Sequence, residues 1–328
     1  MGTKAAGILM EKTIRIKRFD PESKNPQAYH QEFKVEVEES SSVLDALITI
    51  RESIDESLAV RCSCRGAICG SCGLRVNGQG TLACKTKINS LRGSNGTITV
   101  EPMGNMAVVK DLVTDMRPFW EKIRQVTPWL QTTGDAPTAE YLAPPDAMTH
   151  LNPVMGCIMC GVCVSDCTAL EVDPTFVGPA ALAKAYRFVA DPRDAATNQR
   201  LRDLDEPTGM WDCTRCMVCV EVCPKGVAPM DRIMALRSKG MNSGLTDTYG
   251  ARHSMGFIEV VRDKGILDEV MLTIKTLGLF NISRFMGLLP VAIRSLLHGK
   301  LPKPGPFHKP LPGMHNIRRI VDTTEKMK

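Results

Sequence analysis

The chain has 328 residues, 43% of them apolar and 23% charged, and its formal net charge is +5. This length is enough for two domains and an extension, and the apolar content allows each domain a buried core. Because basic and acidic residues are scattered and nearly balanced, the whole-chain charge gives no reason to expect nucleic acid or an anionic membrane as a partner.

The sequence shows neither a targeting signal nor a membrane span. The first residues lack a positively charged stretch followed by an apolar region, so we expect no signal peptide. The most apolar segment, residues 277–297, is interrupted by Arg284, Pro290 and Arg294. A span needs about 18 consecutive apolar residues, so no transmembrane segment is expected.

Alternating polarity predicts strands near the N-terminus. Residues 13–19 and 31–37 each alternate polar and apolar side chains, and prolines separate the two segments. Residues 42–48 have the pattern of a helix, and Ser42 is suited to be its N-cap.

Two further strands are expected before residue 106. The segment 73–78 reads as a strand that enters an Asn-Gly turn, and residues 97–102 form a last alternating stretch. The pattern of residues 1–106 therefore predicts a small α+β domain.

The middle of the chain is expected to be helical. The periodicity of residues 108–126, 180–188 and 230–238 is that of helices, and no convincing strand occurs there. We place this all-helical domain at residues 107–250. The extension, residues 251–328, should form two or three amphipathic helices and a Pro-rich tail at 301–313.

Cysteine is the informative residue type. All 13 cysteines lie between Cys62 and Cys223, in three tight groups. Cysteines two or three residues apart pair poorly with one another, because disulfide geometry constrains their Cα positions. Metal ligation in a reducing compartment is the better interpretation.

The first group is Cys64-x4-Cys69-x2-Cys72, followed by Cys84. This order is the plant-type [2Fe–2S] spacing, and the small residues between the cysteines let a loop wrap a cluster. Zinc is the alternative, but it favours two separated pairs of cysteines. Cys62 lies outside the spacing and is interpreted as a bystander.

The second and third groups repeat one pattern, C-x2-C-x2-C-x3-C, which is that of two-cluster bacterial ferredoxins. In that arrangement the fourth cysteine of each run binds the other cluster. Structural zinc is again the alternative, and it explains two doubled runs poorly. One cluster is expected to use Cys157, Cys160, Cys163 and Cys223, and the other Cys167, Cys213, Cys216 and Cys219.

No other reaction centre is evident in the sequence. The six histidines are isolated, and dinucleotide-binding, nucleophile-elbow and phosphate-binding glycine motifs are absent. The chain is therefore expected to transfer electrons and to carry no substrate site of its own.

The order of these motifs resembles the iron–sulfur subunit of succinate dehydrogenase and fumarate reductase, an oxidoreductase of the tricarboxylic acid cycle. The resemblance implies a β-grasp [2Fe–2S] ferredoxin-like domain, an all-helical two-cluster domain and a helical extension. The matching stretches are residues 61–65, 69–73, 82–84, 108–113, 178–180, 191–194 and 219–226.

The resemblance also implies partners and a place of work. An FAD-containing flavoprotein subunit oxidises succinate or reduces fumarate, and this subunit relays the electrons to a membrane quinone-reacting partner. The complex would lie peripherally on the cytoplasmic face of the cell membrane.

Two departures from the family bear on the third cluster. Most members have a non-cysteine residue at the position of Cys216 and hold a [3Fe–4S] cluster, whereas here a fourth thiolate permits [4Fe–4S]. The family's quinone site uses an aromatic stretch and a histidine nearby, but this chain has residues 168–170 and Asp212 there. The third cluster is thus either [4Fe–4S] or [3Fe–4S].

Residues 265–269 and 308–314 resemble segments of heterodisulfide-reductase-type subunits. This favours the variant class of succinate dehydrogenase with a heterodisulfide-reductase-like membrane partner. Two alternatives remain. One is a subunit of a heterodisulfide reductase-like or thiol:fumarate reductase complex. The other is a free ferredoxin-like carrier, for which 328 residues are unusually many.

Overall fold

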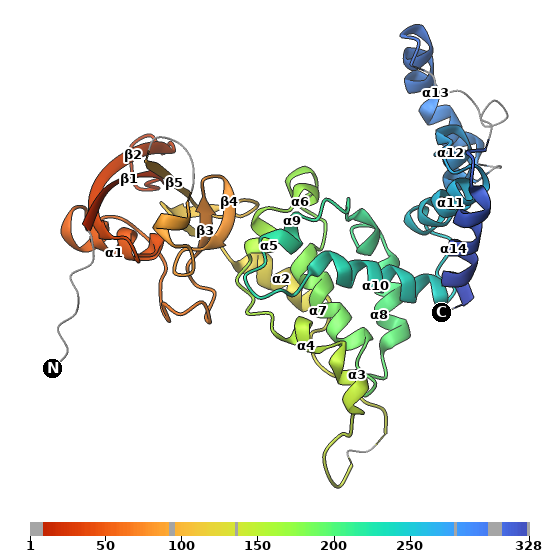
Figure 1. Ribbon diagram of the computed structural model, residues 1–328, viewed down its shortest axis with the longest axis horizontal. Coiled ribbons are helices and arrows are strands. Elements are labelled where there is room, and N and C mark those ends of the chain that lie inside the picture. The colour runs from red at the N-terminus through yellow and green to blue at the C-terminus, as the bar shows by residue number, and fades with distance from the viewer. Residues whose placement is uncertain (1–8, 92–95, 135–136, 279–280, 301–309, 327–328) are drawn as a thin grey trace. The chain divides into compact units, whose positions relative to one another are not determined.

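The computed structural model describes residues 9–91, 96–134, 137–278, 281–300 and 310–326 (Figure 1). The chain divides into two compact units, residues 1–236 and 237–328. Most of the expected Pro-rich tail, residues 301–309, lies outside the described residues.

The first unit begins with a five-stranded mixed sheet in the order β2-β1-β5-β3-β4. β1 pairs antiparallel with β2 and parallel with β5, and β3 pairs antiparallel with both β4 and β5. The expected strands of an α+β domain are therefore present. Their bounds are β1 Leu9–Arg18, β2 Tyr29–Glu38, β3 Gly73–Val76, β4 Gln79–Leu82 and β5 Thr97–Glu101.

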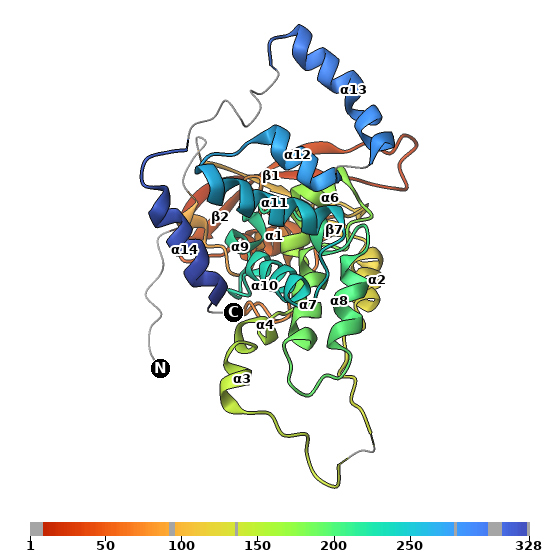
Figure 2. The ribbon, with the colours of Figure 1, turned by 90° about the vertical axis from the view of Figure 1, so that its right-hand side faces the viewer.

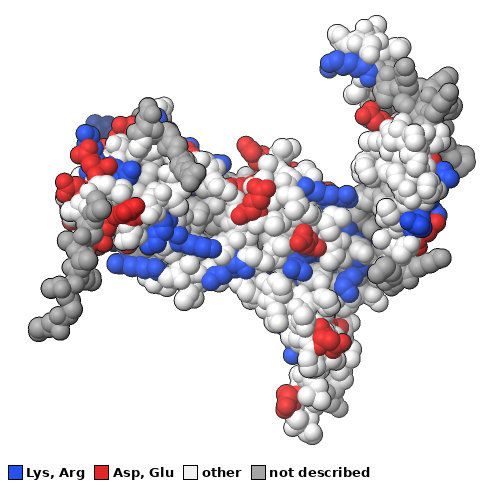
Figure 3. All heavy atoms as spheres, viewed as in Figure 1, with Lys and Arg blue, Asp and Glu red and all other residues white. Residues whose placement is uncertain are grey.

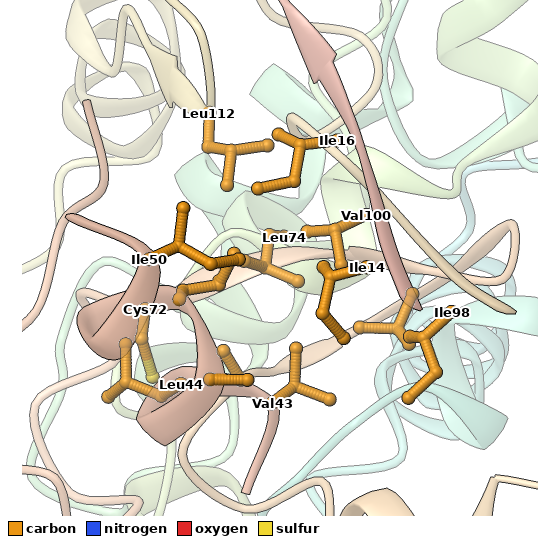
Figure 4. Close-up of a cluster of buried hydrophobic side chains, with 14 of the residues drawn as sticks. Ile14, Ile16, Val43, Leu44, Ile50, Cys72, Leu74, Ile98, Val100 and Leu112 are labelled. Atoms are coloured by element: carbon orange, nitrogen blue, oxygen red, sulfur yellow. The ribbon is translucent and has the colours of Figure 1, made fainter. Parts of the chain in front are cut away.

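One helix, α1 (Val43–Ser53), packs on this sheet. Ser42 is its N-cap as expected: the Asp45 amide donates to the Ser42 hydroxyl at 3.2 Å, and the Asp45 carboxylate accepts from the Ser42 amide at 2.8 Å. Leu44 from the helix lies in the core beside Cys72 (Figure 4). A predicted cluster ligand is thus anchored in the hydrophobic core.

The β3–β4 hairpin turns at Asn77 and Gly78, as the sequence predicts. Both residues have positive φ, 48° and 81°, which is the backbone of a two-residue hairpin turn that matches the strand twist. The Asn77 side chain also accepts a hydrogen bond from the Thr99 amide at 2.9 Å, which ties the turn to β5.

The prediction of a helix from residue 108 is wrong for its first part. Residues there form a small ribbon of β6 (Val108–Lys110) and β7 (Val113–Thr114), so the expectation of no strands in this half is also wrong. Asp111 forms the turn with φ of 47° and is buried, and its carboxylate accepts from the Arg18 guanidinium and the amides of Phe19 and Ala59. These partners are distant in sequence, so helical periodicity could not reveal them.

The rest of the first unit is helical as expected, and α7 (Pro179–Val189) is its most buried helix. Most of the remaining elements are short, and α10 is the longest of them. Their bounds are η1 Ile88–Ser90, α2 Arg117–Gln125, α3 Pro145–Thr149, α4 Asn152–Met155, α5 Val162–Ser165, α6 Thr168–Val172, α8 Thr197–Asp205, η2 Met210–Asp212, α9 Val218–Glu221 and α10 Pro229–Asn242, the last of which crosses into the second unit.

The described residues of the second unit form four further helices, more than the two or three expected. They are α11 (Tyr249–Lys264), α12 (Glu269–Leu277), α13 (Ile282–Leu297) and α14 (Met314–Lys326) (Figure 2). α12 and α14 both pack on α11. Among the described residues, no helix is both long enough and apolar enough to cross a membrane.

Candidate iron–sulfur sites

The first cysteine loop surrounds its sulfur atoms with backbone amides. The amides of Gly66, Ile68 and Cys69 lie 3.3–3.4 Å from Sγ of Cys64, and the Ala67 amide lies 3.3 Å from Sγ of Cys84. The chain accomplishes this by bending sharply: Arg65, Ala67 and Gly70 all have positive φ. Amides directed at sulfur stabilise thiolates and cluster sulfides, so the loop fits a [2Fe–2S] cluster.

The four predicted cysteines of this loop sit in contrasting environments. Hydrogen bonds from Ser71, first from its hydroxyl, together with the Cys64 amide lower the pKa of the exposed Cys69 thiol to about 6. Burial raises the pKa of Cys72 to about 12; a backbone hydrogen bond from Cys84 lowers this pKa, and the Cys84 thiol raises it. A buried thiolate such as Cys72 requires a compensating cation, and iron provides one.

Cys62 is half-buried against the hydrophobic core of the sheet. Cys84 also packs against that core, so burial does not distinguish the two.

The second site brings together the cysteines predicted from the crossed ligand pattern. Cys157, Cys160 and Cys163 of one run line a small cavity with Cys223 of the other run. The other lining residues are mostly apolar, and the Val227 amide donates to Sγ of Cys223 at 3.4 Å. This is a mostly apolar pocket walled by four thiols, which suits a [4Fe–4S] cluster.

The third site is assembled in the same crossed way. Cys167 is buried at the start of α6. Burial raises its pKa, and the nearby thiolates of Cys213 and Cys216 raise it further. Burial raises the pKa of Cys219 to about 12, with contributions from Cys213, Cys167 and Cys216. The fourth cysteine of the first run therefore faces the first three of the second run.

Cys216 is the exposed member of the third site. Its partial burial raises the pKa, but hydrogen bonds, led by the one from the Thr168 hydroxyl, outweigh this and lower the pKa overall. The Thr168 Oγ1 atom lies 3.5 Å from Sγ of Cys216. The environment of Cys216 thus favours the thiolate that a fourth iron would need.

In the second site the net shift of the pKa is upward, unlike that of Cys216. Burial raises the pKa of Cys160 to about 11 and that of Cys163 well above its usual range. In the described part of the chain, no three Cys, His, Asp or Glu side chains converge as ligands for a single metal ion.

The first and second sites touch each other. A Cβ atom added to Gly70 would lie 2.8 Å from Cβ of Cys160, so the two cysteine loops are in direct backbone contact. The Lys85 ammonium donates to the carbonyl oxygen of Pro224 at 3.0 Å. Lys85 and Pro224 follow Cys84 and Cys223 in the sequence, so this bond also joins the two sites.

Asp166 makes a further contact next to the third site. Its carboxylate accepts from the Gly80 amide at 2.6 Å and lies 3.4 Å from the Arg75 guanidinium. The residue precedes Cys167, so it ties the β3–β4 hairpin to the helical domain. The sequence pattern marked neither Gly70 nor Asp166 for this role, because both act through contacts that are distant along the chain.

Two known family models match the chain. Residues 13–121 match the family described as a 2Fe-2S iron-sulfur cluster binding domain, and residues 154–227 match the family described as a 4Fe-4S dicluster domain.

Two relatives are similar to about two thirds of the chain. The fumarate reductase iron-sulfur subunit of Escherichia coli O6:H1 is 38% identical over 220 residues, which are 66% of this chain and 87% of that relative. The succinate dehydrogenase iron-sulfur subunit of Coxiella burnetii is 34% identical over 230 residues, 69% of this chain and 96% of that relative.

A solved structure has the same fold. A chain of the Mycobacterium smegmatis Sdh1 complex in the apo form superimposes with a TM-score of 0.66 at 25% identity, covering 72% of this chain and 98% of that one. The chain belongs to the family of iron–sulfur subunits of succinate dehydrogenase and fumarate reductase, and it is an electron-transfer subunit with one [2Fe–2S] domain and one [4Fe–4S] dicluster domain.

Proposed function

We propose that the chain relays single electrons between an FAD-containing flavoprotein subunit, which oxidises succinate or reduces fumarate, and a membrane quinone-reacting partner. The contact between Gly70 and Cys160 carries this proposal, because it holds the first two cysteine sites against each other. The third site shares the crossed cysteine runs with the second. Three sites in such a sequence suit a relay.

The protein's part in this relay is to hold and tune its clusters. When bound, iron–sulfur clusters accept and release one electron at a time. We assign the [2Fe–2S] cluster to Cys64, Cys69, Cys72 and Cys84. The walls of the second site are mostly apolar, and amide or hydroxyl donors face sulfur atoms in all three sites.

We assign the other two clusters by the crossed pattern. The cavity around the second site and the mutual effects of the third-site thiols on their pKa values support this assignment. Because Cys216 supplies a fourth thiolate, we propose [4Fe–4S] rather than [3Fe–4S] for the third cluster. The ligands are Cys157, Cys160, Cys163 and Cys223 for the second, and Cys167, Cys213, Cys216 and Cys219 for the third.

We further propose that the extension, residues 251–328, docks the subunit to its membrane-side partner on the cytoplasmic face of the membrane. The two family matches end at residue 227, so the extension lies beyond the family's shared core. Its segments 265–269 and 308–314 favour a heterodisulfide-reductase-like partner. The alternative, that these helices only cover the cluster domain, predicts a different outcome on truncation.

Truncation tests the docking role. Gly250 lies within α11, so the chain should be cut after Gly244, which leaves α10 intact. The truncated subunit should keep its three clusters and its flavoprotein while losing attachment to membranes and electron flow to quinone. Loss of the clusters on truncation would contradict docking and support the covering role.

The second candidate function is an electron-carrying subunit of a heterodisulfide reductase-like or thiol:fumarate reductase complex. The resemblance of segments 265–269 and 308–314 to heterodisulfide-reductase-type subunits favours it. The two functions can be distinguished on the intact complex after anaerobic purification. Mass spectrometry identifies its subunits, and parallel assays measure its quinone and thiol activities. Reduction of quinone with succinate supports the first, whereas fumarate reduction with thiols and no quinone activity supports the second.

A further inference from the structure

Helix α13 is mostly exposed: 14 of its 16 residues are exposed, and Phe285 and Ser295 are half-buried. None of its 16 residues is buried, although its sequence is strongly amphipathic. By contrast, α11 buries Ala251, Ser254, Gly256 and Val260, because α12 and α14 pack on it. Figure 2 shows α13 apart from α11 and α14.

The apolar residues of α13 recur at three- and four-residue spacing and share one face. Their exposed fractions are high, for example 74% for Ile282, 61% for Met286 and 78% for Leu297. Leaving an apolar face of this size exposed to water is unfavourable in free energy. The face consists of Ile282, Phe285, Met286, Leu289, Ile293, Leu296 and Leu297.

The opposite face carries the helix's charges. Arg284 and Arg294 lie there with Ser283, at the angular positions that the apolar row leaves free. The Arg284 guanidinium stacks over the ring of Tyr249 in α11, 4.0 Å from its centroid. Because this contact is made by the polar face, the apolar face is left pointing away from α11.

All the charged residues in the sequence around α13 are basic. From Val270 to Val321 the chain contains eight Lys or Arg residues and no Asp or Glu. The whole-chain charge of +5 conceals this segregation. Over the outer part of α13, Figure 3 shows uncharged atoms and basic side chains. The basic residues are Lys275, Arg284, Arg294, Lys300, Lys303, Lys309, Arg318 and Arg319.

The length of α13 bears on the kind of membrane contact. Sixteen residues make a helix of about 24 Å, shorter than the roughly 30 Å of a bilayer's hydrocarbon core. A helix with an apolar face, a basic face and no acidic residue is suited to lie in the plane of a negatively charged lipid surface.

We propose that α13 binds the surface of an anionic lipid bilayer. Its apolar face sinks to the boundary of the acyl chains, and Arg294 lies at the level of the phosphate groups. This lipid contact adds to the membrane docking proposed above. It rests on that proposal only for the assumption that the subunit lies at a membrane. Lipid, rather than a protein partner, is the occupant that the unbroken positive charge favours.

A pair of matched variants tests the proposal. Ile293 lies on the apolar face with 49% exposure, and Val291 lies on the polar face with 63% exposure. Ile293→Asp and Val291→Asp add the same charge to the same helix, but only the first places it in the acyl boundary. The probe is cosedimentation of the purified full-length holoprotein with vesicles of phosphatidylcholine alone or mixed equally with phosphatidylglycerol.

We expect the unaltered protein to bind the mixed vesicles, and added salt to weaken that binding through screening. Ile293→Asp should reduce the affinity about tenfold or more, and Val291→Asp about threefold or less. Both variants should keep the cluster absorbance, since both sites are exposed.

Three results would overturn the proposal. They are no binding to mixed vesicles, equal losses in the two variants, or equal affinity for vesicles with and without phosphatidylglycerol. Binding to native membranes but not to vesicles would assign α13 to a protein partner. None of these results would affect electron acceptance from the flavoprotein, so failure here is distinct from failure of the relay.

Discussion

The hydroxyl of Thr168 donates a hydrogen bond to Sγ of Cys216, with 3.5 Å between the two heavy atoms. Thr168 opens α6 directly after Cys167, and Cys216 belongs to the second cysteine run. The bond therefore crosses between the two runs at the third site. A donor to a ligand sulfur withdraws negative charge and stabilises the reduced form of a cluster.

Replacing Thr168 with Val should make the reduction potential of the third cluster more negative. Loss of one hydrogen bond is worth about 1 kcal/mol, on the order of 40 mV for a one-electron couple. EPR-monitored redox titration measures the shift. Thr168→Ser, which keeps the hydroxyl, should restore the potential, and Thr175→Val, an exposed site bonded to Asp173, should not change it. An unchanged potential in Thr168→Val would show that the bond is not made to a ligand.

The cysteine count predicts about ten irons per chain, from one two-iron and two four-iron clusters. Iron and acid-labile sulfide should be measured on anaerobically purified complex. Cys216→Ser should lower the iron content to about nine and produce the EPR signal of an oxidised [3Fe–4S] cluster, because the third cluster loses its exposed ligand. If the unaltered protein already gives that signal at full intensity without air exposure, Cys216 is not a ligand.

Cys62 and Cys64 should respond differently to the same substitution. Cys64→Ser should abolish or reshape the [2Fe–2S] EPR signal, because three loop amides lie against the Cys64 sulfur. Cys62→Ser should leave the signal intact. The reverse result would mean that the assigned ligands are displaced by two residues.

Gly70→Ala should disturb the contact between the first two sites. Its φ of 75° disfavours a side chain by about 1–2 kcal/mol, and the added methyl would overlap Cys160, which adds roughly 1–3 kcal/mol. Gly78→Ala is the control, since Gly78 has a φ of 81° but no heavy atom within 4 Å of an added Cβ. Thermal unfolding compares their stabilities, and EPR reports any weakened spin coupling between the clusters. Equal effects of the two variants would argue against close contact at Gly70.

Breaking the buried Arg18–Asp111 pair should be strongly destabilising. Arg18→Met leaves the Asp111 carboxylate buried without its guanidinium partner, at a cost of roughly 3–5 kcal/mol. Arg117→Met removes a similarly short pair with Asp115, but Arg117 is 85% exposed, so this control should change little. The measurement is anaerobic urea unfolding of both variants. A small effect of Arg18→Met would mean that solvent reaches the pair.

The cysteine spacing by itself predicted which thiols would form each site, because a C-x2-C-x2-C-x3-C run has one arrangement in which its fourth cysteine serves a neighbouring cluster. The helix capped by Ser42 and the turn at Asn77 were also predictable, since both depend on contacts within a few residues. Features that depend on such local contacts can be predicted from the sequence alone.

Only the tertiary structure decided how the sites meet. Asp111 turns the chain into a ribbon instead of a helix because its carboxylate is satisfied by Arg18 and Ala59, far away in sequence. The approach of Gly70 to Cys160 and the bond from Thr168 to Cys216 likewise join segments that no periodicity connects. Such contacts depend on how separate elements pack, and this is information that spacing along one chain does not contain.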